Sequence, residues 1–289
     1  MITVSDRVRP AAVLRAIGLC AAWLVAASHA AVAEEASRWD GDARNAMRLI
    51  AGSSARGSGA PLRAGIEIRL APGWHTYWRY PGDAGVPPRF DFAGSQNVKA
   101  VEVHWPAPQR LPEEAVTVIG YTGNVILPLT IVPQDRAKPV MLRLKLDYAV
   151  CEKLCIPAEG KAELMLSGGP SSQDAALVAA EARVPKKITL GEGAPLAIKS
   201  VRRENSGPRP RVVVDVAAPA GEAVALFAEG PTPEWALPVP ATVAGAGAGI
   251  QRFAFELDGA PSGQGYDGIA ITLTARAGNN AIEVATRLD

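Results

Sequence analysis

Period-two alternation of apolar and polar residues is the sequence feature that most constrains the fold. It is clearest at Met141–Tyr148, where Leu142, Leu144, Leu146 and Tyr148 would share one face and charged residues the other. This pattern is typical of an antiparallel strand with one face in a core. Shorter segments with the same pattern, separated by turn residues such as Pro-Gly and Gly-Ser, are 65–70, 98–105, 125–132 and 161–166. The sequence therefore predicts a β-sandwich of roughly 130 residues.

The second half of the chain repeats this pattern after one helical segment. An alanine-rich run at 171–183 has apolar residues at helical spacing and is followed by Pro185. Alternating segments follow at 196–202, 211–217, 223–228, 250–257, 268–275 and 281–288. The 24 prolines and 28 glycines also favour short strands joined by turns. We expect an all-β protein with two sandwich domains, residues 34–168 and 191–289, joined by a helical linker at 169–190.

The N-terminal segment has the pattern of a secretory signal. Arg7, Arg9 and Arg15 precede an apolar run at 16–27, which leads to Ala-Val-Ala at 31–33. We expect cleavage before residue 34 and export to the periplasm. Cys20 lies inside this segment and would be removed with it. No stretch reaches the roughly 20 apolar residues of a membrane-spanning helix, so no membrane span is expected.

Charge gives no sign of a polyanionic partner. The full chain has 30 basic and 29 acidic residues, and loss of the signal, with three arginines and one aspartate, changes the net charge from +1 to −1. A nearly neutral protein has no long-range field that would recruit nucleic acid or an anionic membrane. We therefore expect no nucleic-acid partner.

Cys151 and Cys155 are the cysteines that remain after signal removal. Three intervening residues suit a hairpin loop, and opposite positions on paired strands lie about 4.5 to 5.5 Å apart at Cα, within reach of a disulfide. A ring this small stabilises a protein by only about 2 kcal/mol. At an exposed turn, however, the bond would be accessible to an attacking thiolate. We therefore favour thiol–disulfide exchange as the function of the pair.

Two alternatives use the same cysteines. Exported proteins often carry purely structural disulfides. Two thiolates could instead hold copper(I), with His75 as a third ligand. Zinc would need four ligands, and only His75 and His104 remain as histidines. The sequence contains no motif of a serine hydrolase, a zinc protease or a phosphate-binding loop.

Three segments together resemble a known family. They are Pro72–Pro88 (PGWHTYWRYPGDAGVPP), Ile119–Leu129 (IGYTGNVILPL) and Tyr148–Pro157 (YAVCEKLCIP). In this order they resemble the N-terminal periplasmic domain of the thiol:disulfide interchange protein DsbD. The resemblance covers about residues 40 to 168.

The resemblance implies an immunoglobulin-like sandwich with Cys151 and Cys155 as a reversible redox pair that needs no bound cofactor. Family members receive electrons from a thioredoxin-like partner fed through the membrane and pass them to oxidised periplasmic proteins. In the family a cap loop covers the disulfide. The corresponding loop here is 119–123, with Gly120 and with Tyr121 as the cover, and Tyr77 and His75 would line the site.

The chain also departs from the family pattern. The best-known members have a longer interval between the cysteines and a phenylalanine at the cap, where this chain has Gly120-Tyr121. The two β domains resemble a variant associated with copper tolerance. No segment of this sequence resembles the membrane-embedded part or the thioredoxin-like domain of the family. We therefore expect thioredoxin-like periplasmic proteins as partners and a membrane-embedded thiol transporter that acts in trans. Because Tyr121 lies between glycines, we expect it at an exposed loop tip.

Overall fold

A computed structural model describes Met1 and residues 34–55, 60–113, 116–205, 209–232, 235, 237–258 and 265–289. The predicted signal at 1–33, including Cys20, lies outside these ranges except for Met1. Within the described residues, no helix combines the length and the apolar character that crossing a membrane requires.

Two sheets form the first sandwich. One has the order β1 (Asp40–Gly41), β2 (Asn45–Ala51), β3 (Leu62–Leu70), β9 (Asn124–Pro133) and β6 (Val98–Val103). The other has the order β11 (Cys155–Leu166), β10 (Val140–Cys151), β4 (His75–Gly82), β8 (Val116–Thr122) and β7 (Gln109–Glu113), and β5 (Arg89–Asp91) also pairs with β10. These pairs are antiparallel, as the alternating sequence predicts.

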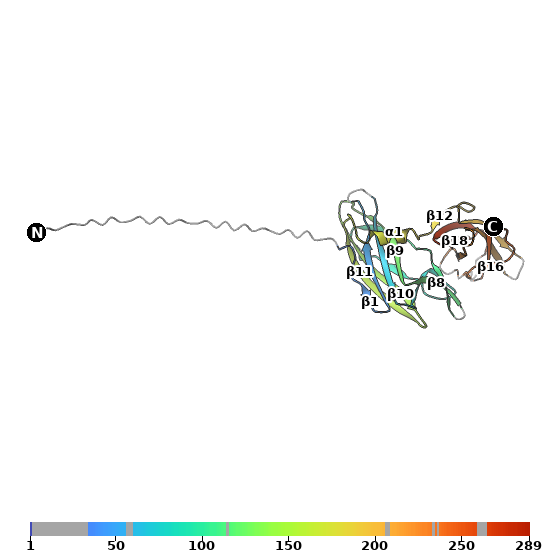
Figure 1. The fold of residues 1–289 in the computed structure, drawn as a ribbon, viewed down its shortest axis with the longest axis horizontal. Helices are drawn as coiled ribbons and strands as arrows, with labels where there is room; N and C mark the ends of the chain where they lie inside the picture. Colours follow the sequence, from blue (N-terminus) through green and yellow to red (C-terminus); the bar gives the residue numbers. More distant parts are fainter. Residues whose placement is uncertain are drawn as a thin grey trace. The chain divides into compact units, whose positions relative to one another are not determined.

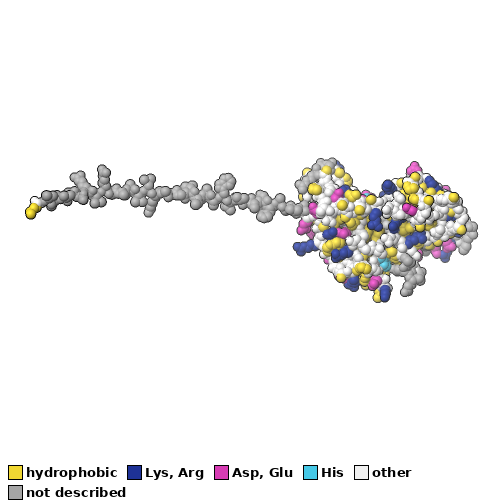
Figure 2. All heavy atoms as spheres, viewed as in Figure 1, with side chains coloured by type: hydrophobic (Ala, Val, Ile, Leu, Met, Phe, Trp, Pro, Cys, Tyr) yellow, Lys and Arg dark blue, Asp and Glu magenta, His cyan; other side chains and the backbone are white. Residues whose placement is uncertain are grey.

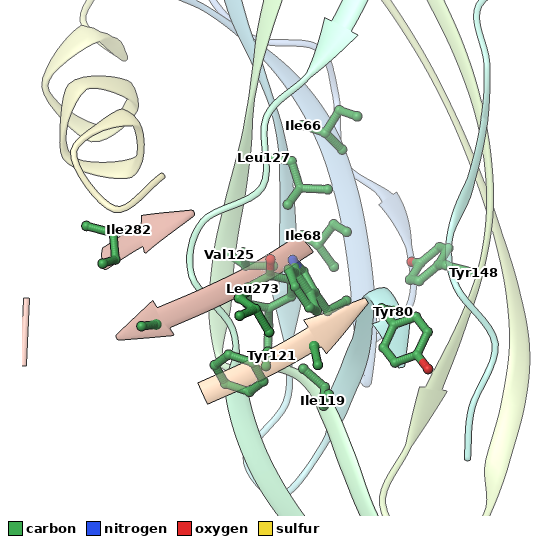
Figure 3. Packing of buried hydrophobic residues seen from close by; sticks show 14 of the residues in the cluster. Ile66, Ile68, Tyr80, Ile119, Tyr121, Val125, Leu127, Tyr148, Leu273 and Ile282 are labelled. Atoms are coloured by element: carbon green, nitrogen blue, oxygen red, sulfur yellow. The ribbon is translucent and has the colours of Figure 1, made fainter. Parts of the chain in front are cut away.

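Strand β10 shows how the alternating pattern builds the core. Leu142, Leu144, Leu146 and Tyr148 are all buried, whereas Asp147 is exposed. Their apolar side chains meet those of the facing sheet across the sandwich. Figure 3 shows this packing, with Ile66, Ile68, Leu127 and Val125 from one sheet and Ile119, Tyr80 and Tyr148 from the other.

The second sandwich also has two sheets. One has the order β12 (Lys186–Lys187), β19 (Asn280–Arg287), β18 (Ala270–Ala277) and β15 (Val224–Glu229), and the other β13 (Ala197–Glu204), β14 (Arg211–Ala217), β17 (Ile250–Glu256) and β16 (Ala241–Val243). Large buried side chains, among them Phe227, Trp235 and Phe253, fill it. The predicted all-β class with two sandwiches is confirmed. The exact domain boundaries stay predictions.

The segment between the sandwiches contains the helix α1 (Asp174–Glu181), which lies beside β9 (Figure 1). Leu177 is fully buried and packs close to Gly52 and Gly65; a Cβ on these glycines would lie 2.5 and 3.1 Å from its side chain. Arg63 pairs with Asp174 and Glu181, at the two ends of the helix, at 2.8 and 2.7 Å. The helix is therefore docked on the first sandwich by packing and by ion pairs.

Of the strands that the alternating pattern does not predict, two border the cysteine pair. Residues 75–82 form β4 although Pro81-Gly82 predicts a turn, and residues 119–122 belong to β8 although they were expected in a loop. The turn lies one residue further on, at Gly123, which has a φ of +66° and open space around it. Short strands next to glycine carry a weak pattern of their own and are stabilised by pairing with neighbours.

Charged side chains of both signs are mixed over the face of the molecule that Figure 2 shows. Surface ion pairs such as Lys145 with Glu159, at 3.1 Å, contribute to this mixture. Exposed pairs of this kind stabilise a fold by at most about 1 kcal/mol.

Because several tyrosines are buried, we expect the protein to lose stability at alkaline pH. Burial raises the pKa of Tyr148 to about 12 and that of Tyr121 well above its usual value. An unfolded tyrosine loses its proton near pH 10, so above about pH 10 the unfolded state binds fewer protons than the folded one and stability falls as pH rises. Urea midpoints measured between about pH 8 and 11 should show this decline. Tyr148→Phe should make it shallower, and a flat profile would contradict the prediction.

Candidate redox site

The two cysteines close the hairpin of β10 and β11. The strands pair in unbroken register from Val140–Leu166 to Cys151–Cys155, and the two Sγ atoms are bonded. The Cα atoms lie 4.1 Å apart, closer than the expected range, because the S–S bond and a three-residue turn hold the strand ends together. The turn residues Glu152, Lys153 and Leu154 are all exposed. The disulfide therefore lies at the tip of a long, regular hairpin.

Alternation along three strands places the disulfide on the side of the sheet away from the main core. Cys151 and Ala149 of β10, Tyr77 of β4 and Val118 of β8 form a small buried cluster of their own, against which Leu111 packs. Their sequence neighbours, such as Trp78, Ile119, Tyr148 and Val150, belong to the main core instead. The same sheet thus contributes one face to the core and the other to the redox pair.

Tyr77 contacts both sulfur atoms. Its hydroxyl lies 2.9 Å from Cys151 Sγ and 3.1 Å from Cys155 Sγ, and the residue is only 2% exposed. Disulfide sulfurs carry no proton, so the hydroxyl is the donor. After reduction the same hydroxyl can donate to a thiolate, and a hydrogen bond to the charged form favours that form. Tyr77 is therefore placed to stabilise the reduced pair.

The two cysteines differ in exposure. Cys151 is 1% exposed, whereas Cys155 is exposed to solvent and follows Leu154, which is 79% exposed. Thiol–disulfide exchange requires the incoming thiolate to reach the sulfur that it attacks. Exposure therefore favours attack on Cys155 over attack on Cys151.

His75 lies next to the disulfide on the neighbouring strand. It is buried, pairs in register with Cys151 and contacts the Tyr77 ring edge-on, with 5.6 Å between ring centroids. His104 directly follows β6 of the other sheet, and its ring contacts Thr130 Oγ1 at 2.7 Å. Among the described residues, no three His, Cys, Asp or Glu side chains are grouped as a metal site. Copper binding by Cys151, Cys155 and His75 stays a prediction.

The expectation that Tyr121 lies at an exposed loop tip is wrong. Tyr121 is 4% exposed, belongs to the main core and donates a hydrogen bond to the Pro106 carbonyl at 2.7 Å. Figure 3 shows it among buried side chains, near Ile119. The physical reason is that neighbouring residues of a strand point to opposite faces of the sheet. On β8, Gly120 is on the face of the redox pair, so Tyr121 points to the core.

Gly120 instead permits a close approach of two strands. It pairs with Tyr77 across β4 and β8, and a Cβ at this position would lie 2.1 Å from the Thr76 carbonyl oxygen. Any larger residue would push β4, and with it Tyr77, away from β8. Gly120 therefore shapes the site through the backbone.

Gly85, which sequence reasoning did not single out, lies directly on the Tyr77 ring. Its φ is +120°, and a Cβ there would come within 2.4 Å of Tyr77 Cε1. Val86, the next residue, is 54% exposed. The sequence feature that could have indicated this contact is the run Gly-Asp-Ala-Gly-Val-Pro-Pro at 82–88. Its glycines mark positions where a side chain would not fit.

Fold and site together define a class: a β-sandwich thiol–disulfide exchange module with its redox pair at a hairpin tip. Residues 46–167 match the family described as thiol:disulfide interchange protein DsbD, N-terminal. The first sandwich is therefore a DsbD N-terminal-like domain, which confirms the resemblance seen in the sequence.

A solved structure is similar over both sandwiches. It is the crystal structure of the N-terminal periplasmic domain of ScsB from Proteus mirabilis, at 20% sequence identity and a TM-score of 0.68. The match covers 88% of this chain and 98% of that one. At this identity it supports the fold of the two sandwiches. The comparison with curated proteins gave no match.

Proposed function

We propose that this protein is a periplasmic electron relay that exchanges disulfides through Cys151 and Cys155. Reducing equivalents come from a membrane-embedded thiol transporter acting in trans, through a thioredoxin-like partner, and go to oxidised periplasmic proteins. The observation that carries this proposal is the asymmetric disulfide, with an exposed Cys155 bonded to a buried Cys151.

Reduction of the pair begins at Cys155. A partner thiolate attacks Cys155 Sγ and forms a mixed disulfide, while the Cys151–Cys155 bond breaks and its electron pair leaves on Cys151 Sγ. The Tyr77 hydroxyl, 2.9 Å from that sulfur, stabilises the leaving thiolate. The partner's second thiolate then attacks its own sulfur in the mixed disulfide and releases Cys155. The partner has lost two electrons and the pair has gained them.

Delivery runs through the same atoms. The Cys155 thiolate attacks a disulfide of the oxidised target and forms a mixed disulfide, and one target sulfur leaves as a thiolate. Cys151 then attacks Cys155 Sγ, re-forms the intramolecular bond and releases the second target sulfur. The target is reduced by two electrons. No bound cofactor takes part in these steps.

The proposal predicts that Cys151→Ser traps targets. In this variant Cys155 can attack a disulfide, but the resolving thiol is missing, so mixed disulfides accumulate. Reduced Cys151→Ser mixed with oxidised periplasmic extract should give adducts that dithiothreitol releases, seen by non-reducing electrophoresis and identified by mass spectrometry. We expect a thioredoxin-fold protein or an oxidised substrate among them.

Cys155→Ser is the matched control, since it retains only the buried cysteine. It should trap at least about tenfold less, because attack by Cys151 requires local opening of the fold. Absence of adducts from both variants, with both folded and with no copper(I) bound by the reduced protein, would leave a structural role for the disulfide. Copper(I) bound one-to-one by the reduced protein and lost in both variants, without adducts, would favour metal binding.

A further inference from the structure

Strand β4 shifts its register with β8 immediately after the residue that contacts the disulfide. Tyr77 pairs with Gly120 of β8, but the next pair is Gly82 with Val118. Residues 78–81 therefore stand opposite a single residue of β8. Such a bulge redirects the side chains on either side of it. Here it lies between the redox pair and the second sandwich.

The bulge is anchored to the second sandwich by ion pairs. Arg79 Nε and Nη2 bond the two carboxylate oxygens of Glu229 at 2.9 and 2.6 Å, and Nη2 also bonds Glu283 at 2.5 Å. All three side chains are largely buried. Burial opposes the charge on Arg79, but the bonds to Glu229 and Glu283 outweigh it and raise the Arg79 pKa. Bidentate pairing of this kind fixes the orientation of the Arg79 guanidinium in addition to pairing its charge.

The residues on both sides of Arg79 also reach the second sandwich. Trp78 is fully buried, and its ring lies 5.8 Å from that of Phe227. The Tyr80 hydroxyl donates to the carbonyl oxygens of Trp235 and Leu237, at 2.6 and 3.1 Å. Three consecutive side chains after Tyr77 are therefore held by the second sandwich.

We propose that the second sandwich positions the Tyr77 hydroxyl on the redox pair through the β4 bulge, with Arg79 and Tyr80 as positioning residues. Tyr77 itself touches the sulfur atoms, whereas Arg79 acts only through the strand. The second sandwich thereby sets how strongly the reduced pair is stabilised. This inference rests on the proposed function to the extent that the pair must open and close.

The direction of the effect follows from hydrogen bonding. A thiolate accepts a stronger hydrogen bond than a disulfide sulfur, so a well-placed Tyr77 hydroxyl favours the reduced form. Releasing the bulge should let Tyr77 move and weaken that bond. The thiol pKa should then rise, and the disulfide should become harder to reduce.

The test is the equilibrium of the full chain with glutathione, measured for Tyr77→Phe, Arg79→Ala and the double variant. Each single variant should shift the equilibrium toward the disulfide by about threefold to tenfold, where tenfold corresponds to about 30 mV. In the Tyr77→Phe background, Arg79→Ala should add almost nothing, because its effect passes through the lost hydroxyl. Additive shifts would overturn the proposal.

Arg252→Ala is the matched control. Arg252 makes a bidentate pair with Asp215, at 2.6 and 2.9 Å, inside the second sandwich, with similar burial. It should lower stability without moving the redox equilibrium. Should Arg79→Ala fail to fold, Tyr80→Phe removes two hydrogen bonds of the bulge and keeps the ring. A glutathione equilibrium that is unchanged in both bulge variants would contradict the inference. The trapping experiment with Cys151→Ser tests the proposed function independently of this result.

Discussion

Gly120→Ala should destabilise the protein by about 3 kcal/mol, the upper part of the range for overpacking. The added Cβ would lie 2.1 Å from the Thr76 carbonyl oxygen and 3.3 Å from Tyr77 Cα. Both neighbours are backbone atoms, so relief requires β4 and β8 to separate. Urea unfolding followed by tryptophan fluorescence measures the loss as a lower midpoint. Moving β4 should also weaken the contact of the Tyr77 hydroxyl with the disulfide.

Gly247→Ala is the control for this prediction. Gly247 lies in the turn before β17, and a Cβ there meets nothing within 4 Å. A substitution at such a site usually changes stability by less than about 0.5 kcal/mol. Equal midpoints for the two variants would show that β4 and β8 tolerate a side chain at 120, contrary to the close approach that the structure shows.

Alkylation of the reduced protein should reveal a large difference between the two thiols. Single-cysteine variants isolate each one: Cys151→Ser leaves Cys155, and Cys155→Ser leaves Cys151. Cys155 should react with iodoacetamide about tenfold faster or more, because Cys151 must first be exposed by local opening and each 1.4 kcal/mol of opening free energy slows the reaction tenfold. The rates are measured by mass spectrometry at fixed pH.

The same variants unfolded in urea provide the control, since burial no longer distinguishes the thiols there and their rates should converge. Thiol pKa values should be measured in parallel, because only the thiolate reacts. They show whether a rate difference comes from exposure of the thiol or from its thiolate fraction. Faster alkylation of Cys151 in the folded state would contradict the assignment of Cys155 as the attacking sulfur. The two cysteines would then exchange the roles of attacking and resolving thiol, and the direction of electron flow would stay the same.

Much of the fold was predictable because its signals are local. Strand β14 has the predicted bounds Arg211–Ala217, and β10 contains the predicted segment Met141–Tyr148. Both have clear alternation, so a few neighbouring residues define a buried face. The disulfide of Cys151 and Cys155 was predictable for the same reason: its geometry depends on a turn of three residues.

The site beyond the sulfurs was only partly predictable. Tyr77 was placed near the pair by resemblance, and the structure brings its hydroxyl to both sulfurs. The sequence pattern predicts neither the burial of Tyr121 nor the contact of Gly85 with the Tyr77 ring. The glycines that flank Tyr121 are typical of a loop, whereas Gly120 is a strand position where two backbones meet.

The sequence by itself determined the all-β class, two alternating halves and a pair of cysteines that a hairpin can join, because each depends on residues close together along the chain. Only the tertiary structure decided which sulfur is exposed, that Tyr77 lies on the disulfide while Tyr121 lies in the core, and that the β4 bulge ties the redox pair to the second sandwich. These features depend on the register between strands distant in sequence and on the face each side chain takes, which local periodicity does not specify.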